Sequence, residues 1–453
     1  MTNSVEPLSA AESAAIGAAS ANVVEDHFFT VSRRYSDTGS WIPASSPFGG
    51  ENTFHRLRTF DFAKMNARTT ESLAEFLSAS VLLHCADAWA YFGRSLAALS
   101  HGSLSVAQHL LYYSELRSAM AILARNGIYC IDRTNFVLDA GKNVHRLKAD
   151  GTHVAVWRYF DAWSRGSAAI SPIAGSVKLL GSALPDWLDA RHGLASAALM
   201  VPQLLSAWGA DLRFYARDQK WRNYNSYVPQ HASAAAQHHT PSWLTSAVSE
   251  VWKLVWSSGG ETFSELDAWL TRGAVQQAFR EATDEEPAYS LKYARVLDTA
   301  LPSLVDAAFQ TRARTVLRNP LGDSPEILRL AEARPHARIP SSVATKGMIG
   351  RALILARLAT ANTQSLATAS GVSPDAFEPW GLDLFLRSGI GVPERSRSGL
   401  LDTQSDIILE LEMLQDSEPD KTLEGLANVS SSWSHSYMLL TKVERALVWS
   451  MVA

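Results

Sequence analysis

The feature that most constrains this chain is a pair of long helical patterns that follow one another with almost no gap. Residues 69–100 and 103–127 both place apolar side chains at the three- and four-residue spacing that lines one face of an α-helix. Ser72 and Glu75 have the spacing of a capping box in the first pattern, and Gly127 suits the position after the end of the second. Because only two residues separate the patterns, we expect an antiparallel pair of helices.

A change of period follows this pair. The segments IYCI, NFVLD and VHRLK, within residues 128–148, are short and prone to form strands, and DAGKN between the last two is a hairpin signal. Helical patterns then resume and continue to the C-terminus. One of them, residues 194–227, contains Pro202, which we expect to kink the helix. The predicted fold class is therefore mainly α, with multi-helix bundles and a small inserted β-meander near residues 128–148.

Turn-forming residues divide the chain into four predicted parts. Residues 1–65 lack a sustained period and contain a stretch rich in proline and glycine, so we expect an irregular N-terminal arm. Residues 66–228 are predicted to form a helical domain that carries the β insertion. Prolines and small residues across 229–242 indicate a linker, and residues 243–453 are predicted to form a second helical domain.

Charge and hydropathy exclude several classes of protein. The chain has a net charge of -4, so no overall basic field draws it to nucleic acid, although a local basic strip remains open. A mean hydropathy of -0.05 and the lack of an apolar run of about 18 residues predict no membrane-spanning helix. The N-terminus has neither a basic start nor an apolar stretch, which predicts a cytoplasmic protein without a secretory signal.

The sequence offers few metal ligands. Cys85 and Cys130 are too few for a disulfide framework or a four-thiolate zinc site, and both are predicted to be buried and unreactive. His231, His238 and His239 could bind a metal ion, but no carboxylate or cysteine stands near them in the sequence. The alternative is an alanine-rich linker with incidental histidines. We therefore expect no metal and no cofactor.

Arg146 and His153 form the first candidate catalytic pair. A histidine near the reacting atom acts as a general acid or base, and an arginine holds a phosphate and stabilises its developing charge. RNA cleavage needs little more, because the 2′-hydroxyl of the substrate is itself the nucleophile. The alternative interpretation is structural: Thr152 caps a helix, His153 is its first residue, and Arg146 lies on a strand or turn.

The segment RDQKWRNYNSYVPQ, residues 217–230, carries the second candidate. Together with the helical pair containing YYSELRSAMAILARNG, the inserted segment and the later long helix, it resembles HEPN-type helical domains over about residues 70–230. Domains of this type are helical bundles, and their RNases carry an arginine and a histidine separated by four to six residues, often beginning Arg-Asn. The resemblance implies that Arg222 and Asn223 start this motif and that Tyr227 stands where the histidine belongs.

The tyrosine is a departure from that motif. Tyrosine ionises at about pH 10 in its reference state, so it is a poor base at neutral pH unless its surroundings perturb it strongly. A catalytically inactive, RNA-binding or purely structural domain therefore fits the resemblance as well as an RNase does. For Arg222, the structural alternative is a basic last turn that the helix dipole favours.

Two functions remain at this point. The resemblance implies a bacterial protein that acts on or binds RNA in anti-phage defence or a toxin–antitoxin system, and a metal-independent RNase if it is catalytic. HEPN-type dimers build their site across the interface, so the resemblance also implies a homodimer or a protein partner. The implied or proposed site residues are Arg146, His153, Arg222, Asn223 and Tyr227. The alternative is a non-catalytic helical adaptor or structural subunit, favoured by 14 tryptophans and the lack of a strong catalytic motif.

Overall fold

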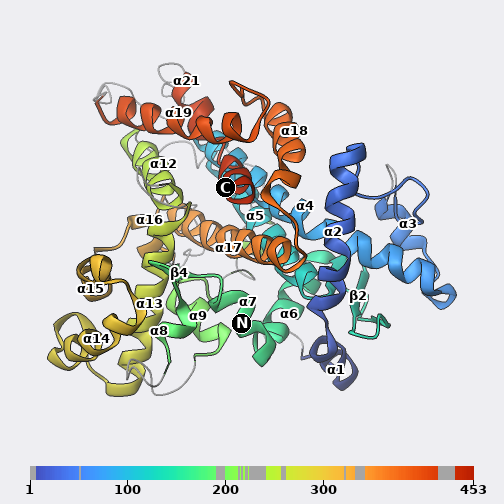
Figure 1. Ribbon diagram of the computed structural model, residues 1–453, viewed down its shortest axis with the longest axis horizontal. Coiled ribbons are helices and arrows are strands. Elements are labelled where there is room, and N and C mark those ends of the chain that lie inside the picture. Colours follow the sequence, from blue (N-terminus) through green and yellow to red (C-terminus); the bar gives the residue numbers. More distant parts are fainter. Residues whose placement is uncertain are drawn as a thin grey trace.

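The computed structural model describes residues 7–49, 53–189, 199–212, 215, 218–219, 223, 241–256, 262–320, 323–331, 342–416 and 434–453. This described part is mostly helical and contains two small antiparallel sheets (Figure 1). The prediction of a mainly α fold with a small β insertion is confirmed.

The longer helices are α1 (Ala10–Ala18), α2 (Ala21–Thr38), α3 (Thr53–Thr59), α4 (Ala67–Ser100), α5 (Leu104–Arg125), α6 (Thr152–Ser164), α9 (Val201–Ala207), α12 (Pro241–Val255), α13 (Ser264–Thr283), α14 (Leu291–Leu304), α15 (Gln310–Arg318), α17 (Ser342–Ala369), α18 (Glu378–Ser388), α19 (Arg397–Asp416), α21 (Ser434–Leu440) and α22 (Arg445–Val452). Single turns form α7 (Ile170–Ala174), α8 (Leu184–Trp187) and α16 (Glu326–Arg329). The 3-10 helices are Phe62–Lys64, Ser167–Ala169, Pro287–Tyr289, Ala307–Phe309 and Pro374–Phe377.

The predicted antiparallel helix pair is confirmed by α4 and α5, but α4 begins earlier than expected. Asn66 is its N-cap: Asn66 Oδ1 accepts from the backbone N–H of Thr69 at 3.0 Å, and Thr69 Oγ1 accepts from that of Asn66 at 2.8 Å. The predicted capping box at Ser72 and Glu75 is therefore wrong, because Asn66 and Thr69 already occupy that role. At the end of α5, Gly127 has a φ of 81°, as its predicted position requires.

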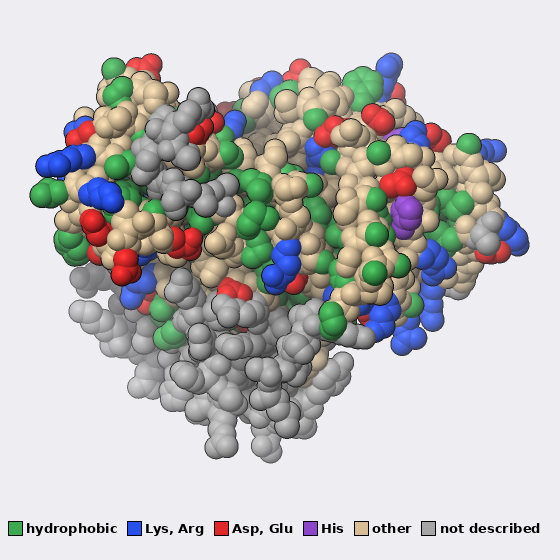
Figure 2. All heavy atoms as spheres, turned by 90° about the horizontal axis from the view of Figure 1, so that it is seen from below, with side chains coloured by type: hydrophobic (Ala, Val, Ile, Leu, Met, Phe, Trp, Pro, Cys, Tyr) green, Lys and Arg blue, Asp and Glu red, His purple; other side chains and the backbone are tan. Residues whose placement is uncertain are grey.

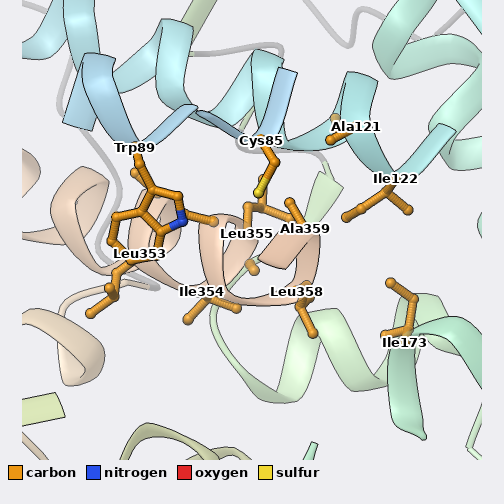
Figure 3. Packing of buried hydrophobic residues seen from close by; sticks show 14 of the residues in the cluster. Cys85, Trp89, Ala121, Ile122, Ile173, Leu353, Ile354, Leu355, Leu358 and Ala359 are labelled. Atoms are coloured by element: carbon orange, nitrogen blue, oxygen red, sulfur yellow. The ribbon is translucent and has the colours of Figure 1, made fainter. Parts of the chain in front are cut away.

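A third long helix, α17, crosses this pair and completes the centre of the molecule (Figure 1). In Figure 3, Trp89 and Cys85 of α4 and Ile122 of α5 face apolar side chains of α17 such as Leu355. The indole Nε1 of Trp89 donates a hydrogen bond of 2.8 Å to the Thr360 hydroxyl of α17. The buried indole is thereby satisfied, and α4 is fixed to a segment 271 residues away in the sequence.

The inserted β-meander is confirmed by β1 (Ile128–Ile131), β2 (Thr134–Leu138) and β3 (Val144–Arg146), which pair antiparallel in that order. β2 is buried along its whole length, so the meander contributes to the core, whereas β3 is half-buried to exposed. A second, minimal sheet pairs β4 (Lys178–Leu179) with β5 (Ser182–Ala183).

Residues 10–38 form α1 and α2, so the prediction of an irregular N-terminal arm is wrong for them. Phe28, Val31 and Tyr35 of α2 recur at three- and four-residue spacing and are buried, and α2 packs on α4. Polar residues separate these apolar positions and give α2 a weak helical signal in the sequence. The prediction of an irregular arm extended the turn-rich region that follows α2 too far toward the N-terminus.

Pro202 does not kink a helix. It lies in the first turn of α9, which begins at Val201, where the N–H that proline lacks has no helical partner in any case. Met200, the residue before the first residue of α9, has an extended backbone with a ψ of 156°. The single long helix predicted over residues 194–227 is therefore interrupted here.

The two predicted helical domains share one core. Trp89 of α4 stacks on Phe263, which directly precedes α13, with ring centroids 5.7 Å apart. Apolar residues from both predicted domains belong to one continuous buried cluster. Residues 229–240 of the predicted linker lie outside the described residues, and Pro241 already begins α12.

None of the described helices has the length and apolar character needed to cross a membrane. On the face in Figure 2, Lys and Arg side chains are interspersed with Asp and Glu over the described surface. This mixture agrees with the small net charge of the chain.

The bond between Trp89 and Thr360 yields a stability prediction. Thr360→Val should lower the free energy of unfolding by about 1–3 kcal/mol, because it leaves a buried indole N–H without an acceptor. Thr360 also donates its hydroxyl to the carbonyl of Ala356, four residues earlier in α17. Thr368→Val is the matched control, since Thr368 donates in the same way to Gln364 but is exposed. Chemical denaturation measures both changes. Equal effects of the two substitutions would contradict the role assigned to Thr360.

Candidate functional site

Arg146 and His153, the first predicted pair, have different surroundings. Arg146 ends β3, is exposed, and holds its guanidinium 4.8 Å from the centre of the Phe62 ring. His153 is half-buried, and its Nδ1 lies 3.0 Å from the hydroxyl of Tyr112 on α5. The described contacts therefore join His153 to α5 and Arg146 to the segment before α4.

Thr152 does not cap α6, as the structural interpretation of that pair predicted. The N-cap is Gly151, and Thr152 Oγ1 accepts a hydrogen bond of 2.9 Å from the backbone N–H of Asp132 in the turn between β1 and β2. His153 is therefore the second helical residue and not the first. The threonine ties α6 to the meander, and this contact sets the position of His153.

The second candidate lies mostly outside the described residues. Arg222 and Tyr227 belong to the part of the chain that is not described, and so do His231, His238 and His239. Asn223 is described and is a half-buried helical residue. Within the described ranges, no group of three or more His, Cys, Asp or Glu side chains is arranged to hold a metal ion.

Both cysteines are buried, as predicted. Burial raises the pKa of the Cys85 thiol to about 12 and also raises the pKa of Cys130. Since the thiolate is the reactive form of cysteine, neither side chain is a candidate nucleophile.

Packing of α6 against α5 creates a cluster that the sequence did not suggest. The rings of His109 and His153 both contact the ring of Tyr113, with centroids 5.0 and 5.7 Å away. Tyr112 contacts His153 at 5.5 Å, and Tyr91 of α4 stacks on Tyr113 at 5.3 Å. We name these five residues the histidine–tyrosine cluster. Tyr112 is fully buried, whereas the other four are half-buried.

A chain of hydrogen bonds orients His153 within this cluster. Trp157 Nε1 donates to the Tyr112 hydroxyl at 3.4 Å, and that hydroxyl lies 3.0 Å from Nδ1 of His153. An indole N–H can only donate, so the tyrosine oxygen accepts from Trp157. The same hydroxyl contacts Nδ1 of His153, which leaves Nε2 on the opposite side of the ring.

Buried charges lie behind Trp157. The Trp157 ring stacks on the Tyr215 ring, with centroids 4.3 Å apart and ring planes 5° from parallel. Tyr215 lies near three charged side chains, Glu115, Asp218 and Arg351. All three have 0–1% of their surface exposed. Arg351 Nη2 donates to Asp218 at 2.5 Å, while its Nε lies 3.6 Å from Glu115. One guanidinium therefore faces two carboxyl groups from different segments of the chain.

Protonation balances these charges. Burial first, and the neighbouring charge of Asp218 second, raise the pKa of Glu115 well above its ordinary value. Burial likewise raises the pKa of Tyr215. Glu115 therefore keeps its proton to higher pH than an exposed glutamate does, and Asp218 is the carboxylate that accepts directly from Arg351.

Two arginines flank the histidine–tyrosine cluster along α4 and α5. Arg94 follows Tyr91 by three residues on α4 and is exposed. Arg117 follows Tyr113 by one turn on α5, is partly exposed, and donates to His84 Nδ1 at 3.0 Å. Burial lowers the pKa of His84, so it is neutral and does not repel the guanidinium. Asp87 lies 3.5 Å from Arg117 and offsets part of its charge.

Sequence reasoning found His153 but missed His109 and Tyr113. The signal was the segment QHLLYYSELR, where His109, Tyr113 and Arg117 recur every four residues on a helix that is otherwise mostly apolar. Polar residues on one line of a buried helix indicate a surface that faces solvent or a ligand.

The chain matches no family model, no curated protein and no solved structure.

Protonation of Glu115 can be measured through stability. The unfolded chain releases this proton at about pH 4.3, whereas the folded chain keeps it to higher pH. The contribution of Glu115 to the free energy of unfolding therefore falls as pH rises from that value through the folded pKa. Glu115→Gln removes this loss, so we expect the variant to gain stability relative to wild type between pH 4 and pH 8.

Denaturation of both proteins across that range measures the difference, with the exposed Glu281→Gln as the control. A constant difference between Glu115→Gln and wild type would contradict the raised pKa.

Asp218→Asn, by contrast, leaves the buried Arg351 without its carboxylate and should destabilise the fold by about 3–5 kcal/mol.

Proposed function

We propose that this chain binds and cleaves single-stranded RNA, with His109 and His153 as its general base and acid. The observation that carries the proposal is the placement of both imidazole rings against the single ring of Tyr113. Two histidines held beside one tyrosine ring supply the two groups that metal-independent RNA cleavage needs, one to remove a proton and one to supply a proton.

The contact with Tyr112 suggests the division of labour. Nδ1 of His153 faces the Tyr112 hydroxyl, so in the imidazolium form the opposite nitrogen, Nε2, donates the proton to the departing 5′-oxygen and the ring becomes neutral. His109 removes the proton of the 2′-hydroxyl, whose oxygen then attacks phosphorus. The bond from phosphorus to the 5′-oxygen breaks as the bond to the 2′-oxygen forms. The products are a 2′,3′-cyclic phosphate and a 5′-hydroxyl, and no metal ion is required in this scheme.

The flanking side chains support a single strand as the substrate. Tyr91 and Tyr113 offer aromatic surface for an unpaired base, and stacking of this kind contributes about 1–3 kcal/mol per base. Arg94 and Arg117 lie along the same helices and can bind phosphates on either side. A local strip of this kind does not require a positive net charge for the whole chain.

The resemblance to HEPN-type domains belongs to the same proposal. It adds a bacterial defence or toxin setting, a homodimer, and Arg222 and Asn223 as phosphate-binding residues. Tyr227 takes the position of the family's histidine, and in our proposal His109 and His153 supply the proton transfers that this tyrosine performs poorly.

Substitution of either histidine tests the proposal. His109→Ala and His153→Ala should each lower kcat/KM by about 100- to 10,000-fold, because each removes one proton-transfer group. The assay is cleavage of a labelled, unstructured RNA oligonucleotide in EDTA, with the product end identified by mass spectrometry. Both variants should melt at temperatures close to that of the wild type, since both side chains are only half-buried.

His101→Ala is the matched control, because His101 is exposed just after α4 and, among the described residues, bonds to its neighbours Ala97 and Ser100. It should cleave at the wild-type rate. Wild-type protein that leaves the RNA intact, or histidine variants that cleave as fast as wild type, would refute the proposal.

A non-catalytic adaptor is the second candidate. Leu409 and Met413 of α19 and Met438 of α21 are 55–58% exposed, and α19 packs against α21. Leu409 and Met413 are four residues apart on one helix face, and exposed apolar side chains that lie together are typical of protein interfaces. If the adaptor function is correct, Met413→Lys abolishes a stoichiometric complex isolated from the native host, while both histidine variants retain it.

A further inference from the structure

A cavity of about 1040 Å³ lies at the other end of α5 from the histidine–tyrosine cluster. Residues of α1, the start of α2, the ends of α5 and α6, α7 and α17 line it. Arg125 marks its place on α5, 16 residues after His109, which at 1.5 Å per residue is a separation of about 24 Å. Its lining contains none of the five residues of the histidine–tyrosine cluster, so the cavity is a separate site, large enough for a small molecule.

Charged side chains in the cavity wall occur as pairs. Arg125, 7% exposed, donates to Glu25, and Arg165 near the mouth makes two hydrogen bonds of 3.1 and 2.9 Å to Asp161. A planar guanidinium beside a carboxylate presents donors and acceptors next to one another. This is the arrangement that two neighbouring hydroxyl groups of a ligand can bridge.

The third arginine in the wall is also neutralised. Arg158, 4% exposed, binds Asp150 at 2.8 Å and Glu12 at 3.1 Å. Several hydrogen bonds offset the effect of burial and lower the pKa of Glu12 to about 2, so it is ionised. Lys148 lies 3.9 Å from Asp150.

Each of the three lining arginines is already paired with a carboxylate. Glu25 and Asp161 are themselves in the lining, whereas Glu12 and Asp150, the partners of Arg158, lie outside it. An anion such as a phosphate would have to displace carboxylates that are already bound, and a cation would have to displace arginines. An uncharged ligand needs neither change, so this pairing favours a neutral, strongly hydrogen-bonding molecule.

Uncharged groups in the wall point to the same class of ligand. Asn126 and Asn362 are 6% and 2% exposed, and each donates its amide N–H to backbone carbonyls of its own helix or of α7. Their side-chain oxygens remain to accept from ligand hydroxyls. Trp163 also lines the cavity and supplies apolar surface for the C–H groups of a sugar ring.

We propose that this cavity binds an uncharged, hydroxyl-rich ring: a sugar, either free or as the ribose of a nucleoside. The Arg125–Glu25 and Arg165–Asp161 pairs bind its hydroxyls, and Asn126 and Asn362 accept from them. This site is independent of the proposed RNA cleavage, because it uses none of the same residues.

Gly17 of α1 allows a direct test. It lines the cavity, and a Cβ atom added there would meet no other atom within 4 Å, so Gly17→Phe can enter the space without a clash. Gly391→Phe is the matched control, since Gly391 is equally open but lies outside the cavity wall. Asp161→Asn is a second variant that keeps the shape and removes one acceptor charge.

The experiment is calorimetric titration of the full chain with ribose, glucose, maltose, adenosine and AMP. We expect at least one of the four uncharged compounds to bind the wild type, and Gly17→Phe and Asp161→Asn to weaken it at least tenfold. Gly391→Phe should bind as the wild type does. Preference among ribose, hexoses and adenosine then identifies the free sugar or the nucleoside as the source.

Three outcomes would overturn the proposal. The first is that none of the four uncharged compounds binds the wild type at millimolar concentration. The second is that binding is unchanged in Gly17→Phe and Asp161→Asn, which would place the ligand elsewhere. The third is that AMP binds more tightly than adenosine, because the cavity would then prefer an anion.

Discussion

Burial of α5 on every side is the constraint on which the rest of the structure depends. From Ser118 to Cys130, through the end of α5 and into β1, every residue is buried. A helix that is buried all round needs partners on all sides, and α4, α17, α6 and the meander supply them. A ligand can therefore contact α5 only where its neighbours leave part of it exposed. The histidine–tyrosine cluster lies near its start, and the hydroxyl-binding cavity lies at its end.

Arginine side chains connect segments of the chain that are far apart in sequence. Arg351 of α17 binds Asp218, and Arg357 of the same helix binds Asp267 of α13 with two hydrogen bonds of 2.9 and 2.8 Å. Each pair is almost fully buried, so removal of one partner leaves an uncompensated charge. These arginines act within the protein. Only exposed or partly exposed ones, such as Arg94, remain available to a polyanionic ligand.

Local pattern explains which elements could be predicted. The helical pair and the meander were found because spacing along a short stretch determines which face of a helix or strand is apolar. α2 was missed because polar residues dilute its spacing, although its apolar side chains are buried against α4. Pro202 was misjudged because its effect depends on where the helix begins, and that boundary is set by the residues around Met200.

The candidate site, too, was only partly predictable from the sequence. The sequence by itself determined the chemical types, a histidine at the start of α6 and a line of His109, Tyr113 and Arg117 at four-residue spacing along α5. It also determined the mainly α fold. Only the tertiary structure decided that His153 packs beside Tyr113, as His109 does, while Arg146 lies over Phe62, because that depends on how α6 packs against α5. Side-chain contacts between separate elements follow from the filling of a shared core, which no spacing within one segment encodes.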